Sequence, residues 1–343
     1  MLTRIFQTGA ADLESAAGIL KRGGLCALPT ETVYGLAADG LNPAAVEKIF
    51  LAKGRPQDNP LILHIDSLET LDKLCELSGE TARRVDQVVR FWPGPLTLVL
   101  PRRPLVPDVV TAGMETVAVR FPANPVAREL IRRAGVPLAA PSANTSGRPS
   151  PTTAGHVAAD LGGKIDCIVD GGPCAVGLES TVLSLAGKPR LLRPGYITLE
   201  QLTQVLGDVE VDSAVFQKMK EGQRASAPGM KYRHYAPRAP LTLVRGSDQA
   251  VLAYLKARVA ENPRTGILCY DGEQNQFSGA AFVLSYGGEG HPEELAVRLF
   301  AALRTFDKTD VERIYARMPS ADGVGLAVVN RLLKAAGHTV IDV

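Results

Sequence analysis

The sequence predicts an α/β protein with two domains, and three observations point to this class. Short apolar runs of strand length alternate with stretches of helical spacing along the chain. The length of 343 residues exceeds the usual size of one hydrophobic core. A stretch rich in proline, basic and aromatic residues near residue 230 interrupts the apolar periodicity. We therefore expect a linker between two sheet domains.

The first domain is expected over residues 1–207. Leu13, Ala17 and Leu20 keep helical spacing before two glycines break it and an apolar strand begins. The strands expected in this half are 25–28, 61–65, 96–100, 117–121 and 136–140, and the helices are 43–52 and one that follows Asn124. Asn124 is of the residue type that caps such a helix.

A linker is expected over residues 208–238 and a second domain over 239–343. The strands expected there are 241–244, 266–270, 281–285, 311–316 and 339–343, and the helices are 249–259, 293–304 and 323–336. Strands and helices in this order fit a smaller, doubly wound sheet of Rossmann-like type.

Composition excludes several classes of protein. With 45% hydrophobic and 22% charged residues the chain can bury a core, and a net charge of +2 gives no strong field for nucleic acid. No apolar stretch approaches the roughly 18 residues that span a membrane. Because the five cysteines form no C-x-x-C pair, we expect reduced thiols, no structural zinc and a cytoplasmic location.

The usual nucleotide-binding loops are absent from the sequence. Nothing matches G-x-x-x-x-G-K-[ST], and Gly323-Val324-Gly325 lacks the third glycine of a dinucleotide fingerprint. Polar segments bounded by glycine or proline instead follow several predicted strands, where open α/β sheets tend to bind ligands. Any nucleotide would have to be held by those segments.

Two of these segments suit phosphate. Lys53 and Arg55 lie in a loop stiffened by two prolines, and they would serve as a point charge and a bidentate fork. Residues 141–152 are rich in hydroxyl and amide donors. Phosphate oxygens accept hydrogen bonds from donors of all these kinds.

Two further polar runs, residues 29–36 and 177–182, also border predicted strands. Taken singly, each segment has an ordinary structural explanation. Thr30 or Thr32 would cap a helix, the cations would be a solvated pair, and His64 would be a satisfied sheet histidine. The separate segments leave these alternatives open.

Together and in order, the segments resemble the YrdC-like threonylcarbamoyl-AMP synthases, specifically the two-domain form with an extra C-terminal domain. The matching motifs are TETVYGLA, KGRPQDNPLILHI, PGPLTLVL, VAVRFP, PSANTSGRPSPT, GLESTV and LRPG, followed by SAPGMKYRHYAP in the linker. The resemblance implies an open, twisted sheet of YrdC-like type and a linker that lies across the active site. In one departure, Leu183-Ser184 stand where the family often has an acidic residue.

By this resemblance the chain is expected to condense L-threonine, bicarbonate or CO2, and ATP into threonylcarbamoyl-AMP and pyrophosphate. A separate complex would then transfer the threonylcarbamoyl group to tRNA, with which the chain itself would make a weak contact. The resemblance implies catalytic roles for Lys53, Arg55, Ser142 and Asn144. The ATP contacts that it implies are Arg55, Asn59, Thr116, Ser142, Asn144, Ser150, Arg193 and His234 or Tyr235. The threonine contacts that it implies are Thr32, His64, Arg120, Ala140 through its backbone, and Ser180.

These assignments agree with the chemistry of the reaction. Arg120 can grip the threonine carboxylate bidentately and so orient the amine. Negative charge on the phosphates calls for Lys53, Arg55 and a Mg2+ ion held by the triphosphate and water. The sequence contains no dedicated metal cage.

Two other functions compete with this interpretation. A non-catalytic RNA-binding module would use a basic and aromatic surface. That surface would comprise Arg148, Lys231, Tyr232, Arg233, Tyr235 and Arg238. A carbamoyl-adenylate enzyme of hydrogenase maturation would carry acylphosphatase and Cys-rich zinc segments ahead of its YrdC-like domain, whereas here the motifs begin near the N-terminus. We therefore favour the synthase.

Overall fold

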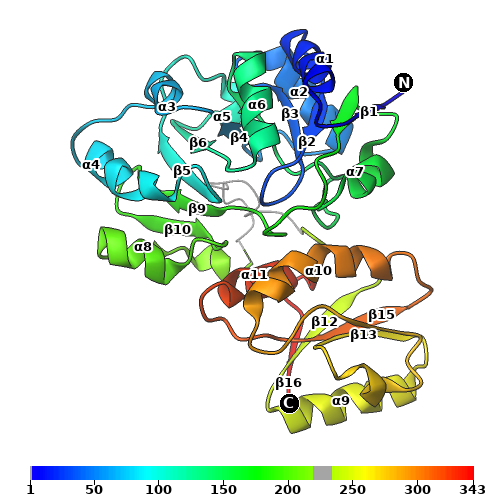
Figure 1. The fold of residues 1–343 in the computed structure, drawn as a ribbon. Helices are drawn as coiled ribbons and strands as arrows, with labels where there is room; N and C mark the ends of the chain where they lie inside the picture. The colour runs from blue at the N-terminus through cyan, green and yellow to red at the C-terminus, as the bar shows by residue number, and fades with distance from the viewer. Residues whose placement is uncertain (1, 219–233) are drawn as a thin grey trace. The chain divides into compact units, whose positions relative to one another are not determined.

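The computed structural model describes residues 2–218 and 234–343, which form two compact units. Each unit has its own sheet (Figure 1). Among the described residues, the first unit comprises 2–146 and 150–215, and the second comprises 147–149, 216–218 and 234–343. The α/β class and the two sheets agree with the sequence prediction.

A large mixed sheet forms the first unit. Among the described residues it has 11 strands in the order β1-β8-β2-β3-β7-β4-β6-β5-β9-β10-β11. The strands are β1 (Arg4–Phe6), β2 (Cys26–Leu28), β3 (Gly35–Asp39), β4 (Ile62–His64), β5 (Leu96–Pro101), β6 (Thr116–Arg120), β7 (Leu138–Ala139), β8 (Cys167–Val169), β9 (Thr181–Ser184), β10 (Arg190–Arg193) and β11 (Glu210–Val211). The helices are α1 (Ala10–Lys21), α2 (Pro43–Lys53), α3 (Leu68–Leu74), α4 (Gly79–Val88), α5 (Asp108–Thr111), α6 (Pro125–Ala134), α7 (Ala154–Leu161) and α8 (Leu199–Leu206).

Local sequence signals set the ends of α6. The Asn124 side chain accepts hydrogen bonds from the amides of Val126 at 2.9 Å and Ala127 at 3.3 Å, so the predicted cap is confirmed. Gly135, with φ 72°, takes the left-handed conformation that ends the helix. The short turn between β6 and α6 therefore begins directly after Arg120.

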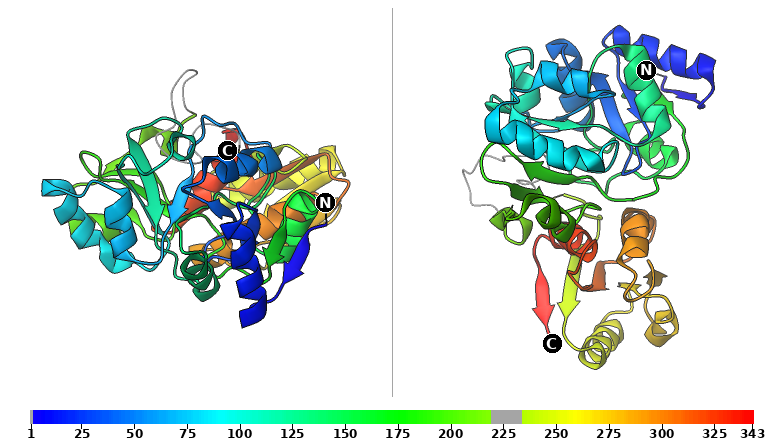
Figure 2. Two further views of the ribbon diagram at one scale, coloured as in Figure 1. Left: turned by 90° about the horizontal axis from the view of Figure 1, so that it is seen from above. Right: turned by 60° about the vertical axis from the view of Figure 1, so that its left-hand side comes forward.

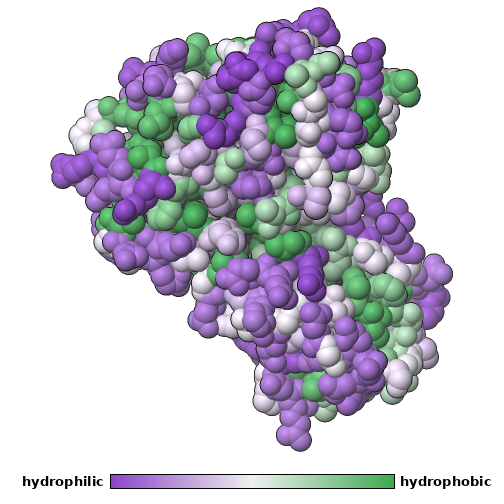
Figure 3. All heavy atoms as spheres, viewed as in Figure 1, coloured by the Kyte–Doolittle hydropathy of each residue, from purple (hydrophilic) through white to green (hydrophobic). Residues whose placement is uncertain are grey.

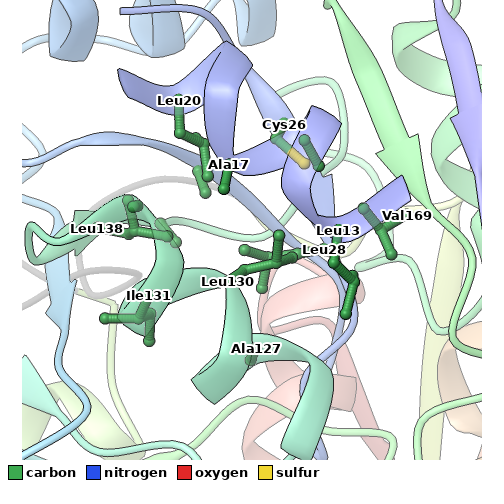
Figure 4. Packing of buried hydrophobic residues seen from close by; sticks show 14 of the residues in the cluster. Leu13, Ala17, Leu20, Cys26, Leu28, Ala127, Leu130, Ile131, Leu138 and Val169 are labelled. Carbon is green, nitrogen blue, oxygen red and sulfur yellow. The ribbon is translucent and has the colours of Figure 1, made fainter. Parts of the chain in front are cut away.

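Helices α1 and α6 pack together on the sheet of the first unit. Figure 4 shows Leu13 and Leu20 of α1 and Leu130 and Ile131 of α6 among apolar side chains of the strands. All members of this cluster are buried, and α1 presents to it the helically spaced positions that the sequence indicated. This packing fixes one face of the sheet that carries the polar segments.

Part of the segment expected as linker belongs to the first unit. β11 pairs in parallel with β10, and Ala214 and Val215 behind it are buried. Two-residue pairing is too short to leave a periodic pattern in the sequence. The middle of the expected linker, residues 219–233, lies outside the described residues.

The second unit is built on a parallel sheet in the order β14-β13-β15-β12-β16. Its strands are β12 (Leu241–Arg245), β13 (Thr265–Cys269), β14 (Phe282–Ser285), β15 (Arg313–Arg317) and β16 (Val340–Asp342). Its helices are α9 (Asp248–Glu261), α10 (Pro292–Phe306) and α11 (Gly325–Ala335). α9 lies on one face of the sheet and α10 and α11 lie on the other (Figures 1 and 2), as in doubly wound folds.

Hydrophilic residues cover much of the face seen in Figure 3. In the part of the chain that the structure describes, no helix combines the length and apolar character needed to cross a bilayer. All five cysteines are buried and none forms a disulfide.

Candidate active site

The polar segment after β2 is a tight, buried turn. Thr30 Oγ1 accepts hydrogen bonds from the amides of Thr32 and Val33, both at 3.2 Å, and donates to the Val33 carbonyl at 2.6 Å. Thr30 therefore stabilises a turn that leads to β3 and caps no helix. The turn holds Glu31 and Thr32 in a fixed position at the end of the strand.

Arg120, the last residue of β6, lies buried against this turn. Its Nη2 donates to Glu31 Oε1 at 2.6 Å, its Nη1 to Thr32 Oγ1 at 2.9 Å, and its Nε to the Gly94 carbonyl at 3.3 Å. A guanidinium has five N–H donors. Within the described residues, three of them are used and two remain for a ligand. Arg120 can thus donate two hydrogen bonds to a carboxylate while three protein contacts hold the plane of its guanidinium.

Glu31 carries the charge that balances Arg120. Burial opposes ionisation of the carboxyl, but the nearby Arg120 charge and hydrogen bond outweigh burial and lower the pKa of Glu31. Its second oxygen accepts from the Asn124 amide at 3.3 Å. Glu31 is therefore an ionised group in the site at neutral pH.

His64 ends β4 and lies level with Arg120, because the two residues are register partners in parallel strands. Burial, and then the Arg120 charge, lower the pKa of His64 to about 3, so its ring is neutral at pH 7. Nδ1 lies 3.3 Å from the Ile62 carbonyl. A neutral imidazole has one N–H donor and one acceptor nitrogen, and the backbone carbonyls of Ile62 and Leu138 both lie at the ring.

Ser180 and Arg193 form a second buried group on the neighbouring strands. The Ser180 hydroxyl lies 2.7 Å from Thr97 Oγ1, and Thr97 is the register partner of Arg120 on β5. Arg193 donates to the Ser180 hydroxyl at 3.1 Å. The sheet therefore connects Ser180 to Arg120 through adjacent strands and connects it directly to Arg193.

Lys53 is nearly fully buried at the end of α2. Its ammonium donates to the carbonyls of Ser142 and Asn144, the latter at 2.6 Å. The Ser146 amide donates back to the Lys53 carbonyl at 2.9 Å. Lys53 thus fixes the backbone of the hydroxyl-rich segment that follows β7.

Arg55 closes the loop that precedes β4. Its Nε donates to the Asn59 carbonyl at 3.2 Å and its Nη2 to the Pro60 carbonyl at 2.8 Å. Ile62 is level with Ala118 in the β4–β6 register, and Asn59 and Pro60 precede β4. Arg55 and Asn59 therefore lie together in the loop before β4, and Thr116 is the first residue of β6.

Thr116, expected at ATP, and Arg120, expected at threonine, lie at opposite ends of β6. Thr116 and Arg120 are the first and last residues of β6, which separates them by roughly 13 Å at about 3.3 Å per residue. The segment after β7 lies against the start of β4, since the Ala140 amide donates to the Ile62 carbonyl at 3.0 Å. Further along, Ser150 donates to the buried carboxylate of Glu179.

His234 and Tyr235 belong to the second unit. The Tyr235 ring is buried and lies 5.1 Å from the Phe300 ring of α10, centroid to centroid. Arg331 lies over the same ring at 5.8 Å. Tyr235 also has a positive φ of 64°. Their expected contact with the nucleotide stays a prediction.

Several residues of the site have no role in the sequence interpretation, namely Glu31, Thr97 and Glu179. Each lies in a recognised motif, but its partner is remote: Glu31 and Arg120 are 89 positions apart, and Thr97 and Ser180 are 83 apart. An acidic residue between two threonines directly after a strand was the available signal for Glu31. No other feature of the sequence pointed to these contacts.

Fold and site together define an α/β protein whose open sheet presents buried, polar binding groups at the ends of its central strands. Residues 18–195 match the Sua5/YciO/YrdC family model, described as "Telomere recombination". Residues 197–337 match the model described as "Threonylcarbamoyl-AMP synthase, C-terminal domain".

Relatives match over nearly the whole chain. A threonylcarbamoyl-AMP synthase of Pyrococcus abyssi is 47% identical over 336 residues, which cover 96% of this chain and 95% of the relative. The Bacillus subtilis threonylcarbamoyl-AMP synthase is 46% identical over 342 residues, which cover 99% and 97%. The structure of P. abyssi Sua5 complexed with L-threonine has a TM-score of 0.92 at 44% identity and covers 100% of both chains. The chain belongs to the Sua5/YciO/YrdC family, and within it to the two-domain threonylcarbamoyl-AMP synthases.

Proposed function

We propose that the first unit condenses L-threonine, bicarbonate or CO2, and ATP into threonylcarbamoyl-adenylate and pyrophosphate. The observation that carries this proposal is the buried Arg120 guanidinium, which keeps two N–H donors for a carboxylate beside the neutral ring of His64. Family membership and the threonine bound to P. abyssi Sua5 support threonine as the amino acid. ATP follows from the adenylate named in the family.

The protein would recognise threonine through its carboxylate and its hydroxyl. The threonine carboxylate would accept from Arg120, and the hydroxyl would form a hydrogen bond with the neutral ring of His64. Ser180 and the backbone of Ala140 would complete the contacts. An amino acid without the hydroxyl would leave buried polar groups unpaired, so it would be discriminated against.

The nucleotide would lie toward the N-terminal ends of β4 and β6. Arg55 and Asn59 lie in the loop before β4 and Thr116 begins β6, and we assign them to ATP together with Ser142, Asn144, Ser150 and Arg193. Lys53 would act in part through the backbone of Ser142 and Asn144, to which it donates. These groups would bring the α-phosphorus within reach of the carbamate.

The proposed reaction has two bond-forming steps. The threonine ammonium loses one proton to solvent, the resulting amine attacks CO2, and a second proton leaves the nitrogen to give the carbamate. A carbamate oxygen then attacks the α-phosphorus, the bond to the β-phosphate oxygen breaks, and pyrophosphate leaves. Placing the reactants together supplies much of the rate, and Arg55 and Arg193 would stabilise charge on the phosphates.

Mg2+ is proposed to arrive with ATP. The residues that the structure describes contain no cluster of three or more His, Cys, Asp and Glu suited to a metal ion. The carboxylates of the site, Glu31 and Glu179, are bonded to Arg120 and Ser150. These residues do not fit a protein cage, and the triphosphate and water would coordinate the ion.

The RNA-binding alternative has little support in the second unit. Arg148 forms an ion pair with Asp307 at 3.0 Å, and the Tyr235 ring is buried. Lys231, Tyr232 and Arg233 lie outside the described residues. A weak tRNA contact, a downstream transfer complex and a cytoplasmic location stay predictions.

The two functions can be separated with labelled ATP. The synthase predicts that label enters an adenylate only when threonine and bicarbonate are both present. An RNA-binding module predicts salt-dependent retention of tRNA on a filter without any such product. Tight tRNA retention combined with no threonine-dependent adenylate would overturn the proposal.

A further inference from the structure

Glu31 borders the guanidinium to which we assign the threonine carboxylate. Its Oε1 lies 2.6 Å from Arg120 Nη2, and its Oε2 accepts from the Asn124 amide at 3.3 Å. The side chain is 12% exposed, so it is only partly buried. Neither the family resemblance nor the proposed reaction gives this carboxylate a task.

The geometry of an α-amino acid makes Glu31 relevant. The N–Cα and Cα–C bonds are each about 1.5 Å long, so the ammonium stays roughly 2.5 Å from the carboxylate carbon. Two Arg120 N–H donors remain for a carboxylate within the described residues. A carboxylate bound to them would bring the ammonium close to the groups around Arg120, and Glu31 is an anion in direct contact with that guanidinium.

The electrostatic surroundings of His64 support this placement. The charged groups that act on the His64 ring are Arg120, which lowers its pKa, and Glu31, which raises it. One cation and one anion therefore lie near the ring that would contact the threonine hydroxyl. A zwitterion with a hydroxyl side chain has three polar ends, and these three residues complement them.

We propose that Glu31 receives the α-ammonium of threonine and so acts as a positioning and specificity residue. The inference rests on the proposed function, since it assumes that Arg120 binds the threonine carboxylate. Arg120 and Glu31 would form a two-point clamp that fixes the nitrogen before it meets CO2. The turn made by Thr30 and the contact with the Asn124 amide hold the carboxylate in place for this task.

A competing hypothesis is that Glu31 only occupies the threonine site of Arg120 in the free protein. Its carboxylate would occupy Arg120 in the free protein and leave when the threonine carboxylate arrives. The two hypotheses predict opposite changes in threonine affinity when Glu31 is neutralised. Neutralising Glu31 weakens threonine binding if it receives the ammonium, and strengthens threonine binding if it competes for Arg120.

The test compares L-threonine with 3-hydroxybutanoate, which keeps the carboxylate and the hydroxyl and lacks the amino group. Binding of both to the full chain is measured by calorimetry for wild type and Glu31→Gln. We expect threonine to bind roughly 10- to 100-fold more weakly to the variant, the range for loss of a charged hydrogen-bond partner. Binding of 3-hydroxybutanoate should change little, so the preference for the amino group falls.

Two variants serve as controls. Glu47→Gln makes the same change at an exposed position of α2 and should leave both ligands unchanged. Glu31→Asp keeps the charge on a shorter side chain and should retain part of the preference, which keeps the test usable if Glu31→Gln does not fold.

Two results would overturn the inference: an equal loss for both ligands in the Glu31 variants, or tighter threonine binding in Glu31→Gln. Failure of the proposed function looks different. In that case wild type itself binds no threonine and releases no threonine-dependent pyrophosphate.

Discussion

Arg193 donates to Ser180 twice, from Nη2 to the hydroxyl at 3.1 Å and from Nε to the carbonyl at 3.0 Å. The two residues are assigned to different substrates, Arg193 to ATP and Ser180 to threonine. Both are nearly fully buried. The pair therefore links the two parts of the site, and a change in one residue should affect the binding of both substrates.

Arg193→Lys tests this link. Lysine keeps the charge but cannot make both hydrogen bonds in the fork geometry. We expect kcat/KM to fall by a similar factor for threonine and for ATP, roughly 10-fold each. Arg190→Lys, at a half-exposed position on the same strand, is the matched control and should be silent. A loss confined to one substrate would show that the pair does not couple them.

Arg120→Lys should instead affect the binding of threonine and leave the binding of ATP nearly unchanged. The guanidinium offers two donors to the threonine carboxylate, and an ammonium cannot reproduce that bidentate contact. Steady-state kinetics should give a threonine KM raised roughly 10-fold or more, with the ATP KM nearly unchanged. Arg83→Lys on exposed α4 controls for the substitution. Equal increases in both KM values would assign Arg120 a general structural role.

Lys53 and Arg55 should differ although they are two positions apart. Arg55→Ala is expected to lower turnover by roughly 10²-fold with the fold intact, because the proposed role is to stabilise charge on the phosphates. Lys53→Met removes the donor from two carbonyls of the segment after β7. It should therefore also lower the free energy of unfolding, by about 1–3 kcal/mol for each carbonyl left unsatisfied. Urea unfolding and kinetics on both variants measure the difference, and near-normal turnover of folded Arg55→Ala would refute its assignment.

His64 should make the protein sensitive to mild acid. Burial lowers the pKa of His64 to about 3, below the ordinary value of about 6.5. A histidine of this kind takes up a proton only on unfolding, so its contribution to stability is complete above pH 6.5 and falls as the pH drops toward 3. The slope is at most about 1.4 kcal/mol per pH unit.

Urea unfolding of wild type and His64→Asn measures this contribution. Between about pH 5 and 6.5 the carboxylates with lowered pKa stay ionised. The difference in unfolding free energy between wild type and His64→Asn therefore reports the contribution of His64. Wild type should lose more stability than the variant as the pH falls in this range. Parallel curves would mean that His64 is not buried in its neutral form.

Local signals in the sequence were sufficient for much of the fold. The strand before Arg120 and the cap at Asn124 depend on neighbouring residues, and both are present. The short strand β11 depends on pairing with β10. Its two residues carry no periodic pattern, so the sequence placed it in the linker.

The contacts within the site could not be predicted from the sequence, because they too depend on partners that are distant in the chain. Motif resemblance supplied the residue types, but Glu31 and its partner Arg120 are 89 positions apart in the chain. Lys53 likewise meets the Asn144 carbonyl 91 positions away. Tertiary packing, which no local rule encodes, decides such partners.

The central claim is that this chain makes an adenylate from threonine, and pyrophosphate release from ATP tests it most directly. The full chain is incubated with ATP, Mg2+ and bicarbonate, with and without L-threonine, and released pyrophosphate is counted beside threonylcarbamoyl-adenylate identified by mass. We predict that release depends on threonine and equals the adenylate formed, and that Arg120→Lys needs more threonine to reach the same rate. Release that is indifferent to threonine, or that yields no threonylcarbamoyl-adenylate, would contradict the account.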